Sequence, residues 1–109
     1  MASLDAFLSL DVRIGTIVSA EFLKGARKPA FALRIDLGEL GTRAGTAEVT
    51  DLYEPEELVG LQVAAVVNLP PRQVAGLVAE VAVLVADNGR GEQALLIPEQ
   101  PVPDGARVV

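Results

Sequence analysis

Four basic side chains occur where the chain would present them to a ligand. Lys24, Arg27 and Lys28 lie in a segment that leads straight into an alternating apolar stretch, and Arg72 follows two consecutive prolines. Ammonium and guanidinium groups donate hydrogen bonds to phosphates, carboxylates and carbonyl oxygens. The loop could therefore clamp phosphates or acidic peptide groups, and the prolines could hold Arg72 over a groove. The alternative is that these cations are solvated and balance nearby acids.

Three further side chains could contact a ligand. Asn68 could present its amide to an extended backbone, because the amide both donates and accepts, or it could satisfy a neighbouring turn. Phe31 and Tyr53 could stack on a base or on a ligand side chain. Phe31 heads a regular apolar face, which favours a place in the core, whereas Tyr53 lies at a strand-to-helix junction.

Carboxylates gather between residues 48 and 57, but their pattern predicts neither a metal site nor an acid-base site. The EF-hand spacing is absent, and acids are ordinary in the first turn of a helix. The chain also has no cysteine and no histidine, which excludes thiol nucleophiles, imidazole bases, zinc fingers and catalytic triads. We therefore expect no enzyme, no metal and no other cofactor.

The elements that must position these residues are mostly strands. In residues 31–37 the large apolar side chains fall on every second position, which is typical of a strand with one buried face. Ser3 can cap a short N-terminal helix, and a proline followed by acids starts another within residues 53–60. The expected strands are residues 12–23 with a bend or bulge near Gly15, then 30–37, 46–52, 62–69, 77–86 and 92–97. Residues 38–45 are expected to be a flexible glycine-rich connection.

This order predicts an all-β fold, a small OB-fold barrel of five to six strands with a short helix between the third and fourth. The 109 residues fit one domain. The predicted fourth and fifth strands are apolar on both faces. A solvent-exposed apolar face of this kind would indicate an interface with a partner protein. We therefore expect a homodimer that covers it.

The net charge and the first residues of the chain limit the classes of partner that we expect. The formal charge is −6, from 15 acids against 9 bases, which opposes non-specific attraction to phosphate backbones. Only four residues are aromatic, few for a base-stacking platform. The first residues lack a basic region and no apolar run could span a bilayer, so we expect a soluble, cytoplasmic protein without membrane insertion.

Several motifs together resemble one family. They are Asp-Val-Arg-Ile-Gly-Thr-Ile at residues 11–17, Ala-Arg-Lys-Pro-Ala-Phe at 26–31, Leu-Tyr-Glu-Pro-Glu-Glu-Leu-Val-Gly at 52–60, Val-Val-Asn-Leu-Pro-Pro-Arg at 66–72 with Ala-Gly at 75–76, and Gln-Pro-Val-Pro at 100–103 with Gly105. The chain is similar over nearly its whole length to CsaA-type proteins, within the family of tRNA-binding domains similar to the EMAP-II cytokine domain.

The resemblance implies a single OB-fold domain over residues 1–109, with terminal extensions used in a homodimer. It also implies a chaperone that binds unfolded or pre-secretory polypeptides and is linked to export, with the secretion machinery as a further partner. Relatives in the family recognise tRNA, and neither activity is enzymatic.

The chain departs from the family pattern near the expected ligand face. Glu48 stands where relatives carry an amide, and Gln73 where they often have a second arginine. A basic residue and a serine of the pattern appear as Val78 and Ala79. These changes remove positive charge or hydrogen-bonding groups, so they count against tRNA binding.

The expected site is a groove with an apolar floor and a rim of cations, in which Asn68 fixes an extended peptide. The alternative is a tRNA or structured-RNA module using the same loops, whose affinity would fall steeply with salt. The candidate peptide- or RNA-binding residues are Lys24, Arg27, Lys28, Phe31, Glu48, Tyr53, Asn68 and Arg72.

Overall fold

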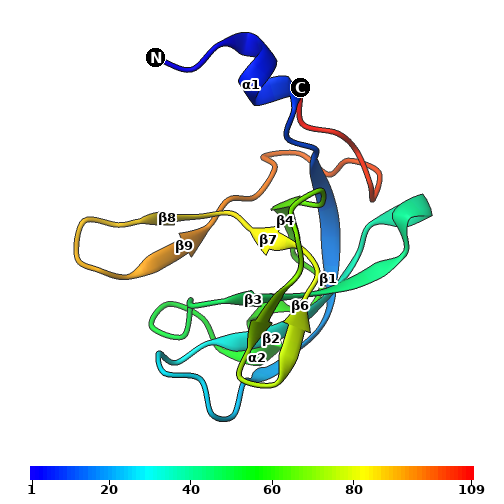
Figure 1. Ribbon diagram of the computed structural model, residues 1–109. Helices are drawn as coiled ribbons and strands as arrows, with labels where there is room; N and C mark the ends of the chain where they lie inside the picture. Colours follow the sequence, from blue (N-terminus) through cyan, green and yellow to red (C-terminus); the bar gives the residue numbers. More distant parts are fainter.

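The computed structural model describes all 109 residues and contains nine strands and three short helical segments (Figure 1). The elements in order are α1 (Leu4–Leu8), β1 (Val12–Phe22), β2 (Phe31–Asp36), η1 (Gly38–Leu40), β3 (Thr42–Ala47), α2 (Pro55–Leu58), β4 (Gln62–Val66), β5 (Arg72–Val74), β6 (Leu77–Ala79), β7 (Ala82–Val83), β8 (Val85–Asp87) and β9 (Gln93–Leu95).

Five strands form one antiparallel sheet in the order β3-β2-β1-β4-β7, and β5–β6 and β8–β9 form two separate hairpins. The sheet curls until its edge strand β3 meets the chain after β6, where the N–H groups of Glu80 and Val81 donate to the Ala44 carbonyl at 2.8 and 3.2 Å. This nearly closed barrel confirms the predicted OB-fold, and α2 lies between β3 and β4 as expected.

The core confirms the alternation in β2. Phe31, Leu33 and Ile35 are each 0–1% exposed, whereas Arg34 between them is exposed. They pack in one cluster with residues from β1, β4 and α2, among them Ile17 and Leu58. One face of β2 therefore holds the centre of the barrel.

The predicted bulge near Gly15 is wrong in position. The register of β1 on β2 shifts between Ile17 and Ser19, so Val18 is the extra residue. Gly15 has a different role, which is to let two strands pack closely. A Cβ at this position would lie 2.6 Å from Ile35 Cγ2 and 2.7 Å from the Asp36 carbonyl oxygen. Glycine permits the close approach of β1 to β2.

Two other strand predictions need correction. The third strand begins at Thr42 rather than residue 46, so it includes part of the glycine-rich segment predicted as a connection. The predicted strand over residues 77–86 is divided into β6, β7 and β8, and β5 was not predicted. The chain changes partner at each break, from β5 to β4 and then to β9.

The outer face of the fourth strand, which we expected a homodimer to cover, is buried within the chain itself. Ala64 and Val66 pack with Val12 and Ile14 in a second buried cluster, which Val102 of the C-terminal segment helps to cover. That segment is held because Gln62 Nε2 donates to the Val102 carbonyl at 2.7 Å. The fourth-strand part of the surface that suggested a homodimer is thus covered within one chain, whereas Val78 of the predicted fifth strand remains 46% exposed.

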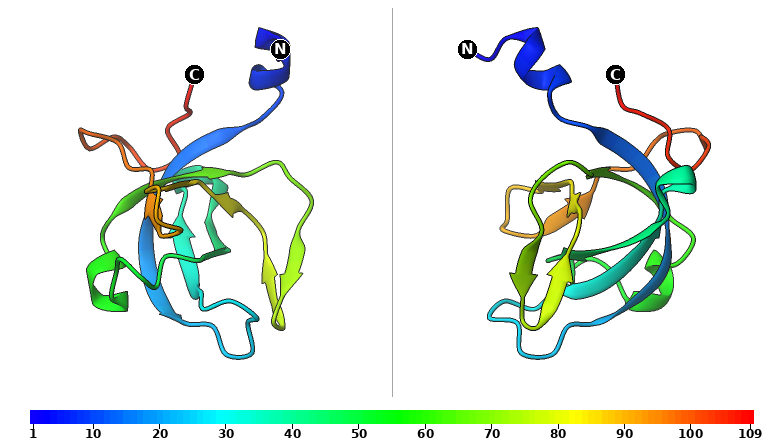
Figure 2. Two further views of the ribbon diagram at one scale, coloured as in Figure 1. Left: turned by 90° about the vertical axis from the view of Figure 1, so that its left-hand side faces the viewer. Right: turned by 45° about the vertical axis from the view of Figure 1, so that its right-hand side comes forward.

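The short helices start as predicted. The Ser3 side chain accepts from the Ala6 N–H at 3.1 Å and caps α1, and the Glu54 N–H donates to Glu57 Oε1 at 2.8 Å in a capping box of α2. No residue of α1 is buried, and the helix projects from the barrel (Figures 1 and 2). No helix has the length and apolar character needed to cross a membrane.

Candidate ligand-binding groove

Three adjoining hollows lie over the last residues of β3, and Glu48 lines all of them. Their volumes are about 480, 340 and 280 Å³. They are bounded by the loop of residues 24–29, the β5–β6 hairpin and the β8–β9 hairpin. We call them together the Glu48 groove. Its charged and amide side chains are Arg27, Lys28, Glu48, Asp51, Arg72, Gln73 and Gln93.

Two turns form one end of the groove. The loop reverses at Gly25 (φ +83°), and the Leu23 N–H donates to the Ala30 carbonyl at 3.0 Å across its base. The β5–β6 turn has positive φ at both Ala75 (48°) and Gly76 (85°), as a type I′ hairpin requires. A Cβ on Gly25 would lie 3.9 Å from the Ala75 Cβ, so the two turns meet. This end of the barrel lies opposite the termini (Figures 1 and 2).

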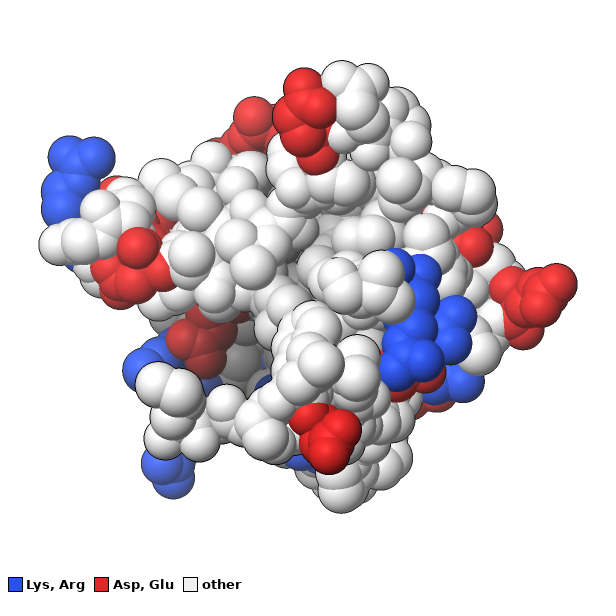
Figure 3. Space-filling view, turned by 90° about the horizontal axis from the view of Figure 1, so that it is seen from above, with Lys and Arg blue, Asp and Glu red and all other residues white.

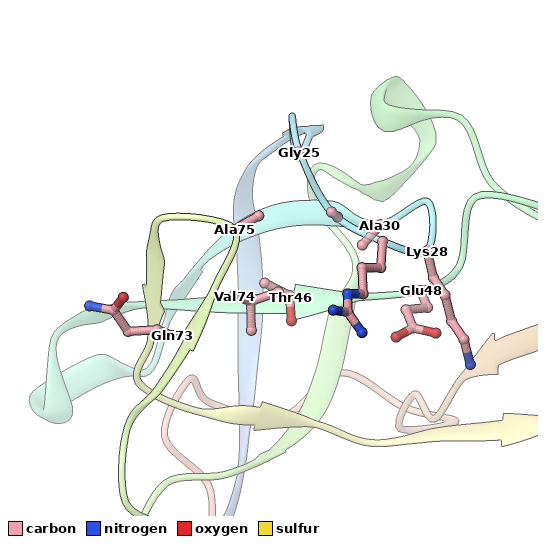
Figure 4. Close-up of a pocket in the computed structure, with 10 residues that line it drawn as sticks. Gly25, Lys28, Ala30, Thr46, Glu48, Gln73, Val74 and Ala75 are labelled. Carbon is pink, nitrogen blue, oxygen red and sulfur yellow. The ribbon is translucent and has the colours of Figure 1, made fainter.

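The groove carries charges of both signs. Arg27, Lys28, Glu48 and Arg72 are all exposed, and none of them takes part in the two ion pairs of the structure. Figure 4 shows the Lys28 and Glu48 side chains pointing to the same side of β3. Figure 3 shows a hollow below the hairpin on the left in which acidic and basic atoms lie together. These groups are free to bind a ligand.

The floor of the groove is small and apolar. Ala30 and Ala47 are buried beneath it, and Val74, Val83 and Val85 are partly buried at its sides. Such a floor accepts apolar side chains, whereas the rim offers hydrogen-bond donors. The structure therefore brings an apolar floor and a cationic rim together in the groove.

Four of the eight predicted residues lie outside the lining, and Lys24, Phe31 and Tyr53 are three of them. Lys24 is exposed on the loop but does not border the hollows. Phe31 is fully buried against Phe22, with ring centroids 4.9 Å apart, so it belongs to the core. The Tyr53 hydroxyl accepts from the Leu95 N–H at 3.2 Å, which fixes β9 to the segment before α2.

Asn68 has a structural role outside the groove, beside the segment between α1 and β1. Its Oδ1 accepts from the Asp11 N–H at 2.9 Å, and its Nδ2 donates to the Ser9 carbonyl at 2.8 Å. Both polar ends of the amide are thus engaged with the segment between α1 and β1. In this arrangement the amide holds the N-terminal segment rather than an extended ligand.

Gln93 is the lining residue that sequence reasoning missed. It lies on β9, far along the chain from the basic loop, and reaches the groove only because the β8–β9 hairpin folds over β3. A single glutamine in a short polar stretch carries no signal for this. The position of the hairpin depends on long-range contacts such as the one between Tyr53 and Leu95.

The two ion pairs lie at the root of α1. Asp11 is 2.6 Å from Arg13 Nε and 3.8 Å from Arg107 Nε. The hydrogen bond from Arg13 holds the pKa of the Asp11 carboxyl below its usual value, although partial burial acts in the opposite direction. Arg107 also donates to the Leu8 carbonyl at 3.2 Å, so this cluster joins the two ends of the chain.

No three acidic side chains converge as a metal site would require. The carboxylates of residues 48–57 separate instead into the groove, a turn and the capping box of α2.

Comparison with known proteins agrees with the fold. Residues 12–107 match the family described as "Putative tRNA binding domain". The structure resembles chaperone CsaA from Bacillus anthracis with a TM-score of 0.94 and 47% identity, covering 100% of this chain and 99% of that one. It resembles the CsaA chaperone protein from Picrophilus torridus with a TM-score of 0.93 and 35% identity, covering 100% of both.

Relatives also occur within larger proteins. The chain is 40% identical over 105 residues to a methionine–tRNA ligase of Methanococcoides burtonii, covering 96% of this chain but 15% of that protein. The chain thus spans about 15% of the length of such ligases. The two CsaA structures, by contrast, match end to end. The chain belongs to the tRNA-binding-domain family and is a CsaA-type member of it.

Proposed function

We propose that the protein is a homodimeric chaperone of the CsaA type that holds unfolded or pre-secretory polypeptides in the Glu48 groove. The observation that carries this proposal is the likeness to the Bacillus anthracis chaperone, at 47% identity over 99% of that chain. The family description and the ligases support binding of a macromolecule but not catalysis by this domain. Pre-secretory clients exist before export, so the proposed setting is the cytoplasm and the proposed role is linked to secretion.

The groove suits an extended polypeptide. Arg27, Lys28 and Arg72 can donate to backbone carbonyls or carboxylates, and the amides of Gln73 and Gln93 can both donate and accept. The apolar floor can take small apolar side chains. Because every unfolded chain offers carbonyls and scattered apolar groups, we expect broad selectivity and modest affinity.

The dimer is proposed on a new surface. Leu4, Phe7, Leu8 and Leu10 of α1 and the residues after it are 71%, 42%, 44% and 39% exposed. A five-residue helix gains no stability alone and needs a surface to pack on. A second copy of the chain would supply a surface on which α1 can pack. The terminal extensions would then act in dimerisation, as the resemblance implies.

A tRNA-binding module is the second candidate, favoured by the family match and by the three cations of the groove. The formal charge of −6 and the carboxylate in the groove oppose it. The exposed aromatic rings are Phe7 at 42% and Phe22 at 61%, and neither lines the groove.

Paired charge removal tests the groove. In the double variant Lys28→Ala, Arg72→Ala, we expect the affinity for a fluorescein-labelled unfolded pre-secretory peptide to fall about tenfold, because two donors to the ligand are lost. The double variant Arg34→Ala, Arg90→Ala removes the same charge outside the lining and should bind as the wild type does. Equal affinities for the two double variants would exclude the groove as the binding site.

A further inference from the structure

The groove has three cations and two acids, and Glu48 is the acid that lines all three hollows, whereas Asp51 lines one. The Glu48 carboxylate has no partner. It is exposed, forms neither of the two ion pairs, and accepts none of the side-chain hydrogen bonds of the structure. An ionised carboxylate can accept several hydrogen bonds. All of this capacity is therefore available to a ligand.

Glu48 lies where a ligand in any of the three hollows would be close to its negative charge. It follows the last residue of β3 and lines each of the three hollows, two of them together with Lys28 and the third together with Arg72. A ligand that occupies any of the three hollows therefore lies beside this carboxylate.

Ligands of different charge would meet the groove differently. A phosphate backbone would gain from the three cations but would bring its negative charges against Glu48, and like charges repel. A polypeptide that offers one Lys or Arg side chain between acidic neighbours can pair its basic group with Glu48 and its acidic groups with the cations of the groove. The Lys or Arg side chain of such a segment is attracted to Glu48, whereas the phosphates of a nucleic acid are repelled by it.

We propose that Glu48 is a specificity-determining residue that selects polypeptide segments with a Lys or Arg side chain flanked by acidic residues, and that weakens binding of RNA. This inference rests on the proposed function, because it concerns the same groove. Since the site is open to solvent, the selection is expected to be about fivefold, as for an exposed ion pair.

The test uses two labelled unfolded peptides of equal length. One has Lys between two glutamates, and the other has norleucine at that place. We expect the wild type to bind the Lys peptide about fivefold more tightly and Glu48→Gln to lose this preference. The control Glu56→Gln, an exposed acid of α2 outside the groove, should keep it.

A 12-nucleotide oligouridine gives the second measurement, with the same variants at low salt. We expect Glu48→Gln to bind it about fivefold more tightly than the wild type and Glu56→Gln to bind it as the wild type does. Because glutamine has nearly the same shape as glutamate, the folded structure should not change, and a thermal melt checks this.

The failures are distinguishable. If the wild type binds both peptides but prefers neither, or if Glu48→Gln keeps the preference, the assignment of Glu48 is overturned while the chaperone proposal stands. If the wild type binds neither peptide but binds the oligouridine, the proposed function is overturned and this inference with it.

Discussion

The Asp11 carboxylate, just after α1, pairs with Arg13 of β1 and with Arg107 near the C-terminus, and so joins both ends of the chain to the barrel. Arg13 and Arg107 face it, and its own backbone N–H donates to Asn68. Because the hydrogen bond from Arg13 lowers the pKa of Asp11 in the folded protein, ionisation of this carboxyl favours folding. The contribution is present above the unfolded-state pKa of 3.8 and is lost as the pH falls through the lower folded-state pKa.

The Asp11→Asn variant tests this linkage. We expect its free energy of unfolding to be lower than that of the wild type at pH 7 by less than about 1 kcal/mol, because the site is open to solvent. The difference should shrink as the pH falls below 3.8. Urea titrations at several pH values measure it, and a difference that grows in acid would contradict the account.

Gly15 is the position where a single methyl group should cost most. In Gly15→Ala the new Cβ meets three atoms at 2.6–2.7 Å, one of them the Asp36 carbonyl oxygen. We expect a loss of about 3 kcal/mol in the free energy of unfolding. Gly45→Ala is the matched control, since its nearest neighbour is a valine methyl at 3.2 Å. Equal losses for the two variants would show that the approach of β1 to β2 is not the cause.

The residues of the groove were only partly predictable. Arg27, Lys28 and Arg72 follow from their local setting, since a proline beside a strand end keeps its neighbours near the surface. Asn68 could not be assigned, because an amide suits a ligand and a backbone equally well and only the fold shows that Ser9 and Asp11 engage it. Phe31 was correctly favoured as a core residue by its alternation.

The β5–β6 hairpin is the element that carries Arg72 and Gln73, and its turn is strained. Ala75 has φ +48°, a region that costs residues with a Cβ about 1 kcal/mol. Asparagine tolerates this region and with Gly76 gives the Asn-Gly pair preferred in type I′ turns. We therefore expect Ala75→Asn to raise the free energy of unfolding by about 0.5–1 kcal/mol.

The control for this change is Val78→Asn, which places the same amide on the exposed side of β6, outside the turn. Thermal melts of the three proteins compare them. A melting temperature of Ala75→Asn at or below that of the wild type would contradict the assigned turn.

Elements with one buried face were predictable, and elements that change partner were not. Alternation identified β2, and proline with acids identified α2. The stretch of residues 77–86 is apolar nearly throughout, so its composition hides the breaks between β6, β7 and β8. These breaks are set by the strands that it meets, and the partners β4, β5 and β9 come from distant parts of the chain.

At the scale of the whole molecule, the proposed homodimer rests on the exposed apolar side chains of α1. We expect light scattering at micromolar concentration to give twice the 11.4 kDa of one chain. Phe7→Asp should lower the mass to that of one chain, because it puts a charge on the apolar side of α1. Val59→Asp changes a valine that is 51% exposed at the end of α2 and should remain dimeric. A wild type with the mass of one chain would remove the basis for the dimer.

The central claim is that the groove binds unfolded polypeptide in preference to RNA. Fluorescence anisotropy of a labelled, unfolded pre-secretory peptide with the purified protein tests it directly, with unlabelled tRNA added as competitor at physiological salt. The account predicts that the peptide binds and that tRNA fails to displace it, because the net charge of −6 and Glu48 oppose phosphates. Absence of peptide binding, or complete displacement by sub-micromolar tRNA, would contradict it and identify the protein as an RNA-binding module.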